Sequence, residues 1–198
     1  MPETKRRLLD ATVGLMLRQG FTATTVDQIC AGAGLTKGSF FHYFESKEAI
    51  GEAVLDHYYA RQQEKLAAAG LNEVSDPLER LHTLLEFLGA SVRDTAEVQG
   101  CLMGNLAQEL AVTHPRIRSR CDEKFSNFAR WIQELLTQAK AKRCPRAVFD
   151  PAGVALLFVS LMQGSLLLAK ARQDKALLGE NLDHFRRYVD SLFVKPAR

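Results

Sequence analysis

The sequence predicts an all-α protein of about nine helices. A three-helix domain with a helix-turn-helix, residues 1–47, joins a larger helical domain, residues 48–198. Apolar residues recur with a helical period in every long segment, and no alternating run is long enough for a strand. Cap residues and glycines at short intervals divide the chain into helix-sized pieces. These observations favour packed helices throughout.

Local signals define the first four helices. Gly20 ends the first apolar stripe, as a glycine behind a helix often does. Thr25 and Gln28 form a capping box, and that helix stops at Gly34 after two turns. Thr36 caps a short third helix, and a long fourth helix follows. The predicted ranges are 2–19, 25–34, 36–43 and 46–69.

The rest of the chain predicts a larger helical unit. Pro77, Pro115 and Pro151 each stand where a helix begins, a position at which the missing N–H costs nothing. Polar residues at 70–76 and 143–149 form the clearest connections. The predicted helices cover residues 77–98, 101–111, 115–142, 151–171 and 177–194.

The composition is that of an ordinary soluble protein. Hydrophobic residues are 46% of 198 and charged residues 25%, and the net charge of +3 permits nucleic-acid binding without requiring it. No apolar run approaches the roughly 20 residues that span a bilayer. Residues 1–5 lack the core of a signal peptide. We therefore expect a cytoplasmic protein with no membrane partner.

Motifs for catalysis and metal binding are absent. The sequence has no GxSxG, P-loop, HExxH or GxGxxG, so we expect no enzyme, no catalytic residue and no cofactor. The cysteines form no CxxC pair and show no ligand spacing with histidine, so we expect free thiols and no metal. They are Cys30, Cys101, Cys121 and Cys144.

Residues 24–47 carry the clearest functional pattern. Two short helices joined by a glycine turn are the layout of a helix-turn-helix, whose second helix enters the DNA major groove. Polar groups of its first turn suit base edges or phosphates, Phe41 suits a thymine methyl, and later polar tips suit phosphate. Phe40 and Phe44, spaced four residues apart, should face inward, whereas Phe41 projects differently. The candidate DNA contacts are Thr25, Thr36, Lys37, Gly38, Ser39, Phe41, His42, Tyr43 and Lys47. The alternative is a small helical packing unit with no role in DNA binding.

The same stretch resembles a known family. The runs GFTATTVDQICAGA (20–33) and GLTKGSFFHYFESKEAI (34–50) are similar to the signature of TetR-family repressors. The resemblance implies a homodimer that binds a palindromic operator in double-stranded DNA and releases it when a small molecule enters the C-terminal domain. It also implies that the residues named above other than Gly38 are the DNA contacts. Many relatives have tyrosine where this chain has Phe41, so one hydroxyl contact to phosphate is missing here.

A second segment suggests a chemical sensor. Residues 100–111 resemble a TetR subgroup that includes the repressors of N-ethylmaleimide reductase and of acrylate catabolism, some of which respond to electrophiles through a cysteine placed like Cys101. Cys101 follows Gly100 and is expected in the first turn of a helix, where a thiol pKa is lowered. Asn105 should lie on the same face. The alternative is that Cys101 is a small buried hydrophobic residue.

A non-covalent ligand would lie among apolar helices. Candidate pocket residues are Phe87, Ser91, Phe128 and Trp131, and each is alternatively plain core. The last two helices are broadly apolar and are the expected homodimer surface, forming a four-helix bundle across the dimer. Alternatively, one apolar face of these helices packs within the subunit.

Two other functions compete with the repressor. One is a helical enzyme with Cys101 as nucleophile and Glu109 or His114 as base; the other is a helical ligand sensor that does not bind DNA. For the repressor, we expect that an effector moves the long helix of residues 46–69 and changes the spacing of the two recognition helices.

Overall fold

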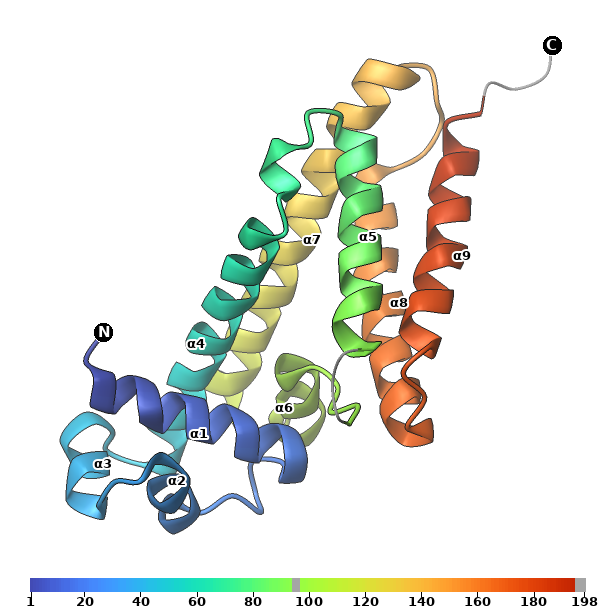
Figure 1. Cartoon of the computed structure of the whole chain (residues 1–198). Coiled ribbons are helices and arrows are strands. Elements are labelled where there is room, and N and C mark those ends of the chain that lie inside the picture. The colour runs from blue at the N-terminus through green and yellow to red at the C-terminus, as the bar shows by residue number, and fades with distance from the viewer. Residues whose placement is uncertain (94–96, 195–198) are drawn as a thin grey trace. The chain divides into compact units, whose positions relative to one another are not determined.

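A computed structural model describes residues 1–93 and 97–194, and within them the chain forms nine α-helices, one short 3-10 helix and no strand (Figure 1). The all-α prediction is therefore confirmed. The packing forms two compact units. Unit 1 is Met1–Gln63 with Gln99–Lys124, and unit 2 is Glu64–Val98 with Phe125–Arg198. This grouping differs from the expected division at residue 47, since unit 1 also takes in most of the fourth helix and a segment from mid-chain.

Unit 1 contains the helix-turn-helix and the helices that support it. Four of its helices lie wholly within the unit: α1 (Glu3–Gln19), α2 (Val26–Ala33), α3 (Lys37–Tyr43) and α6 (Leu102–Leu110). Two longer helices, α4 (Lys47–Ala68) and α7 (Pro115–Arg143), begin in it. Apolar residues of its helices are fully buried, among them Leu8, Met16, Ile29, Phe40 and Ile50. Because these residues come from α1 to α4, the three short N-terminal helices share one core with the start of α4.

Ion pairs join α4 to α7 within unit 1. Glu52 pairs with Arg116 at 2.9 Å, while Asp56 pairs with both Arg120 and Lys124 at 2.8 Å. The partners on each helix are four residues apart, so they lie along one face of each helix. Each pair has at least one partner that is 40% exposed or more, so the pairs add little stability, but they keep these two helix faces together.

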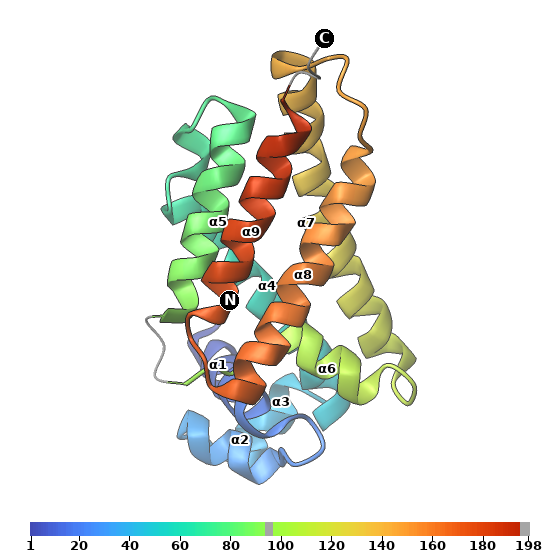
Figure 2. The same ribbon diagram turned by 90° about the vertical axis from the view of Figure 1, so that its right-hand side faces the viewer.

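Unit 2 is a bundle of helices in which α8 and α9 lie side by side (Figure 2). It contains the 3-10 helix (Leu71–Glu73), α5 (Pro77–Arg93), most of α7, α8 (Pro151–Arg172) and α9 (Leu177–Leu192). Its core includes Leu81, Leu84, Phe158, Leu182 and Phe185. A Cβ on Gly89 of α5 would lie 3.2 Å from Cα of Gly179 on α9, so the two backbones approach closely here because both residues are glycines.

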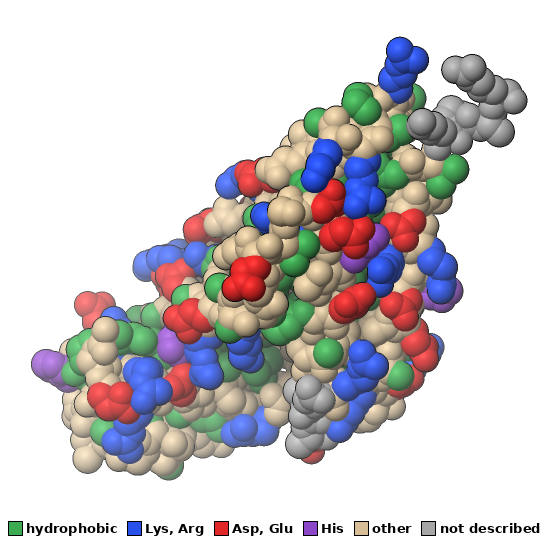
Figure 3. All heavy atoms as spheres, turned by 45° about the horizontal axis from the view of Figure 1, so that its top comes forward, with side chains coloured by type: hydrophobic (Ala, Val, Ile, Leu, Met, Phe, Trp, Pro, Cys, Tyr) green, Lys and Arg blue, Asp and Glu red, His purple; other side chains and the backbone are tan. Residues whose placement is uncertain are grey.

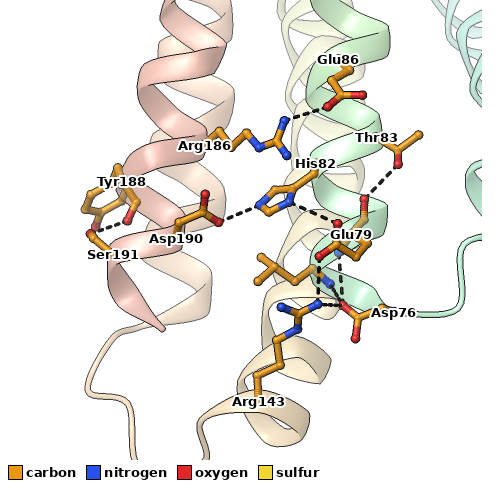
Figure 4. A network of polar contacts seen from close by, with 11 residues as sticks. Asp76, Glu79, His82, Thr83, Glu86, Arg143, Arg186, Tyr188, Asp190 and Ser191 are labelled. Carbon is orange, nitrogen blue, oxygen red and sulfur yellow. Dashed lines mark hydrogen bonds and ion pairs between the residues drawn. The ribbon is translucent and has the colours of Figure 1, made fainter. Parts of the chain in front are cut away.

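A polar network joins α5, α7 and α9 on the outside of unit 2 (Figure 4). His82 of α5 is largely buried, and its Nε2 lies 2.8 Å from the Asp190 carboxylate of α9. Arg186 of α9 donates to Glu86 of α5 at 2.7 Å. Figure 3 shows that acidic and basic side chains are interspersed over the face in view, with no large patch of one sign.

Asp76 caps α5 and binds two bases of α7. Its Oδ1 accepts from the amides of Leu78 and Glu79 at 3.0 and 3.2 Å, and its carboxylate pairs with Lys142 and Arg143 at 3.0 and 2.8 Å. Burial alone would raise the pKa of Asp76, but these partners outweigh it and hold the pKa well below its usual range. The folded protein therefore binds this proton less readily than the unfolded chain does.

Replacing Asp76 by alanine should lower the free energy of unfolding at pH 7 by about 1 kcal/mol, a typical value for a lost N-cap. A lowered carboxyl pKa stabilises the fold above the unfolded value of about 4, and this contribution is lost as the pH falls towards the folded pKa. Urea denaturation of both proteins at pH 7 and pH 3 should show the difference shrinking at pH 3. An equal difference at both values would mean that the charge of Asp76 contributes nothing.

Two expectations about the helices were wrong. The helix expected to reach residue 98 ends at Arg93 as α5; residues 94–96 lie outside the described residues, and Val98 is not helical. The chain also has an apolar run of membrane-spanning length, because α8 is long and apolar enough to cross a bilayer by length and composition. Core helices of soluble proteins can be equally long and apolar, and one face of α8 is packed in the core of unit 2.

Candidate DNA-binding surface and sensor region

The α3 helix begins with a polar first turn. The Thr36 side chain caps it by accepting from the Ser39 amide at 3.2 Å, and the two hydroxyl oxygens lie 3.1 Å apart. Lys37 is exposed and pairs with the exposed Asp27 of α2 at 2.8 Å. An ion pair this exposed is easily exchanged for another partner. The first turn of α3 therefore presents two hydroxyls and one ammonium to solvent.

Aromatic side chains continue this surface along α3. Phe41 is 55% exposed, an unusual position for a large apolar ring. His42 is exposed, and its ring lies edge-on to the Tyr43 ring at 4.6 Å between centroids. Phe40 and Phe44 instead point inward and are buried, as predicted. The inward phenylalanines thus anchor α3 while the other aromatic groups remain available.

Gly38 has no steric role within the protein. A Cβ at this position would meet only the Thr36 hydroxyl at 3.6 Å, an ordinary contact. By contrast, Gly34 has a positive φ of 61° and closes α2, so a glycine there is required by the backbone. A glycine at 38 is therefore better explained by something outside the chain that approaches the backbone.

The capping box on α2 is confirmed. Thr25 accepts from the Gln28 amide at 3.2 Å, and the Gln28 side chain accepts from the Thr25 amide at 2.9 Å. Gln19 of α1 donates to the same Gln28 side chain at 3.0 Å. This small network fixes α2 to the end of α1.

Lys47 has partners within the protein. Its ammonium donates to the carbonyl oxygens of Phe21 and Thr22 at 3.2 and 3.4 Å and lies 4.4 Å from the centroid of the Phe21 ring. No sequence pattern indicates this contact, because the partners are about 25 residues away. A contact of Lys47 with phosphate stays a prediction.

Cys101 is the N-cap residue of α6, one position before the expected first turn. The residue is 7% exposed, and the hydroxyl of Tyr58 on α4 bonds to its thiol and to the Leu102 amide. Burial raises the pKa of Tyr58 well above its usual range, and the neighbouring Cys101 raises it further. Burial, with a smaller contribution from Cys101, raises the pKa of Cys121 to about 11. The thiol of Cys101 thus lies in unit 1 among a phenol and a second thiol.

The residues proposed as a nucleophile and base are held apart. Glu109 lies eight positions beyond Cys101, which is about 12 Å along a helix. Its carboxylate accepts from the amides of Phe21 and Thr22, and the His114 ring lies edge-on to Phe21. Asn105 turns back to donate to the Gln99 carbonyl at 3.1 Å. These contacts bind the α1–α2 turn and the loop before α6.

The predicted pocket residues lie in unit 2, whereas Cys101 and Asn105 lie in unit 1. Phe87, Phe128 and Trp131 are partly buried against the unit 2 core, and Phe128 stacks on Trp131 at 6.0 Å. Ser91 is exposed and donates to the Leu88 carbonyl. The sequence missed Gln163 of α8, whose Nε2 is buried without a hydrogen-bond partner among the described residues. A polar group of a ligand or partner would satisfy it.

An open hollow of about 470 Å³ lies between α1 and the end of α2. Arg7 crosses it and donates to the Ala33 carbonyl, which satisfies one of the free carbonyls at the end of α2. Asp10, also in its lining, binds His57 and Arg61 of α4 at 2.7 and 2.8 Å. Both charged groups of α1 in this lining therefore have partners on α2 or α4.

The outer face of α8 is apolar and uncovered. Four leucines are between 45% and 62% exposed: Leu156, Leu157, Leu167 and Leu168. A Cβ on Gly164 among them would meet nothing within 4 Å, so the subunit itself does not need a glycine there. Such a face is typical of a surface that another helix covers.

Comparisons with known proteins agree with this arrangement. Residues 8–54 match the family model described as "Bacterial regulatory proteins, tetR family", and residues 77–185 match "Tetracyclin repressor-like, C-terminal domain". An HTH-type transcriptional regulator from the lacX 3′ region of Lactococcus lactis is 31% identical over 180 residues, 91% of this chain and 90% of that protein.

Two further relatives cover nearly the whole chain. The HTH-type transcriptional repressor NemR of Escherichia coli is 25% identical over 98% of this chain and 96% of its own, and the crystal structure of its reduced form gives a TM-score of 0.79 over 99% and 100% of the two chains. A regulatory protein TetR from Rhodobacter sphaeroides gives 0.81 at 28% identity, over 96% and 98%. The chain belongs to the TetR family of bacterial regulatory proteins.

Proposed function

We propose that this chain is a homodimeric repressor that binds a palindromic operator and releases it when an effector acts on its helical domain. Proteins of this family are helix-turn-helix transcriptional regulators that act as dimers and respond to small molecules, and they are not enzymes. The observation that carries the proposal is the exposed surface of α3. It combines hydroxyls, an exchangeable ammonium, an exposed phenylalanine and a glycine that the fold does not need.

Each group on this surface has a part in the proposed complex. Lys37 gives up Asp27 and donates to a guanine edge or a phosphate, and Thr36 and Ser39 donate to either. Gly38 lets a phosphate approach the backbone, while Phe41 contacts a thymine methyl. Thr25, His42, Tyr43 and Lys47 hold the flanking phosphates. A protein that works on DNA in this way acts in the cytoplasm.

The dimer forms through α8 and α9. The exposed leucines and Gly164 of α8 would meet the same face of a second subunit, and the two pairs of helices would form a four-helix bundle. This contact would also cover the apolar length of α8. The partner of α8 is then a second copy of the chain, and no membrane is needed.

Cys101 is the proposed sensor for an electrophile. The thiol, as thiolate, adds to an electron-poor alkene; the new bond joins Sγ to carbon, and the proton lost by sulfur ends on the adjacent carbon. An adduct on a buried residue needs space, so α6 and its neighbours must move. A non-covalent effector near Phe87, Phe128 and Trp131, which are partly buried against the unit 2 core, is the other candidate.

One experiment tests both parts. The protein first selects duplexes from a random-sequence pool, and the affinity of the best duplex is measured by fluorescence anisotropy with and without N-ethylmaleimide. We expect an enriched inverted repeat whose binding falls at least about tenfold after treatment, since allosteric coupling is commonly 5–150-fold. The Cys101→Ser variant should not respond, and Cys144→Ser, which removes a partly exposed thiol of unit 2, should respond like the wild type.

The outcomes separate the claims. If no sequence is enriched, the chain is not a sequence-specific repressor. If the operator is bound but N-ethylmaleimide has no effect, Cys101 is a structural residue and the effector binds non-covalently. If Cys144→Ser abolishes the response, the sensor is Cys144 and not Cys101.

A further inference from the structure

The turn between α1 and α2 is held from two sides in unit 1. The Glu109 carboxylate at the end of α6 accepts from the Phe21 amide at 2.8 Å and from the Thr22 amide at 2.7 Å. On the other side, Lys47 of α4 donates to the carbonyls of the same two residues. The backbone N–H and C=O groups of two successive residues, Phe21 and Thr22, are thus all bound by charged side chains from elsewhere in the chain, and such bonds are about twice as strong as neutral ones.

The Phe21 side chain fixes the same turn by packing. It is 3% exposed, and its ring lies edge-on to His114 with 5.3 Å between centroids. A Cβ on Gly51 of α4 would lie 2.8 Å from the Phe21 ring, so the glycine makes room for it. The turn therefore has little freedom to rotate while Glu109 and Phe21 stay in place.

Hydrogen bonds also join the α1–α2 turn to the start of the helix-turn-helix. The Thr24 hydroxyl donates to the Gly20 carbonyl at 2.6 Å, and Gln19 donates to both the Ala23 carbonyl and the Gln28 side chain of the α2 capping box. Gly20 itself has a φ of 80°, and a Cβ there would lie 2.7 Å from the Glu109 carboxylate. A continuous set of hydrogen bonds thus runs from α6 to the start of α2.

We infer that Glu109 is a positioning residue for operator binding: through the α1–α2 turn it holds the helix-turn-helix in the orientation that the operator requires. The inference rests on the proposed function and adds a route by which the sensor reaches the DNA. Cys101 begins α6 and Glu109 lies in its last turn, so a displacement of this nine-residue helix at one end moves the carboxylate at the other. This route needs no change in the recognition helix itself.

Charge and shape of the Glu109 site suit this role. Burial alone would raise the pKa of Glu109, but hydrogen bonds from Thr22 and Phe21 and the nearby Lys47 outweigh it, so the pKa lies below its usual value. The group is therefore ionised at neutral pH, when it accepts both amides. A glutamine of the same shape keeps one acceptor and turns an NH₂ group towards the other amide.

The test measures two affinities of the same variants. Glu109→Gln should bind the duplex that the wild type selects from the random pool about tenfold more weakly, while its affinity for a scrambled duplex of equal length and its melting temperature stay near those of the wild type. Gln108→Ala, which alters the neighbouring exposed residue of α6, should bind both duplexes like the wild type. Gly20→Ala should also weaken operator binding, because its Cβ displaces the carboxylate and an alanine is strained at a φ of 80°.

Amide exchange in the wild type provides a second readout that needs no variant. Modification by N-ethylmaleimide should speed exchange at Phe21 and Thr22, and not in Cys101→Ser. Unchanged operator affinity in Glu109→Gln, or an equal loss for the operator and the scrambled duplex, would overturn the positioning role while leaving the repressor intact. Release of DNA without faster exchange at the turn would overturn the route through α6. Failure of the wild type to select any duplex would instead refute the proposed function, and this inference with it.

Discussion

Replacing both Leu156 and Leu167 by glutamate should yield a folded monomer that binds the operator at least about a hundredfold more weakly. The two leucines are 62% and 48% exposed on α8 and have no core role within the subunit, so the substitutions should not unfold unit 2. Four charges in a symmetric apolar contact would prevent it from forming. A monomer contacts one half-site, and linking two sites typically raises affinity by factors of 10² to 10⁴.

Sedimentation and anisotropy measure the two effects together. Val112→Glu with Val148→Glu is the matched control, because these valines are 94% and 100% exposed in the connections that follow α6 and precede α8, outside the helical face of the leucines. The control should remain dimeric and bind the operator normally. A dimer that survives glutamates at 156 and 167 would show that another surface joins the subunits.

Replacing Lys37 by alanine should weaken operator binding by about a hundredfold. A base or phosphate contact of this kind is worth about 1–3 kcal/mol, and a symmetric dimer makes it twice. Two losses of about 1.4 kcal/mol each correspond to a hundredfold change in the dissociation constant. The folded protein should be unaffected, because the partner of this ammonium among the described residues is an exposed carboxylate.

Asp27 supplies a control of opposite sign. Its carboxylate competes with DNA for Lys37 in the free protein, so Asp27→Asn should bind the operator at least as tightly as the wild type does. Both variants are measured by anisotropy over a series of salt concentrations, since lost phosphate contacts also reduce the salt dependence. Equal affinities for Lys37→Ala and the wild type would remove α3 from the recognition surface.

The fold was predictable where its signals are local. The capping box of Thr25 and Gln28 joins residues three apart, and the left-handed Gly34 ends the same helix. Residues close together in the sequence therefore predict both the start and the end of α2. The inward and outward aromatic residues of α3 also follow from helical spacing, and both directions are confirmed. The end of α5 carried no such signal, and its predicted end at residue 98 was wrong.

The contacts around Glu109 and Cys101 could not be predicted from local sequence signals. Glu109 meets the α1–α2 turn from 87 and 88 residues away, and Tyr58 meets Cys101 from a different helix. No motif marks such pairs, since only the packing of α6 beside α1 and α4 brings them together. The uncovered face of α8 is an intermediate case: its apolar pattern was visible, but whether a subunit core or a second molecule covers it depends on the neighbouring helices.

The ion pairs between α4 and α7 have a further consequence for how signals travel. Acceptors at 52 and 56 face donors at 116, 120 and 124, all at intervals of one helical turn, and Asp56 already touches two donors. Pulling the helices apart would break every pair, whereas a slide along their common direction would exchange partners and keep most of them. The ion pairs therefore allow α4 to move lengthwise along α7 at low electrostatic cost, and they oppose its separation from α7.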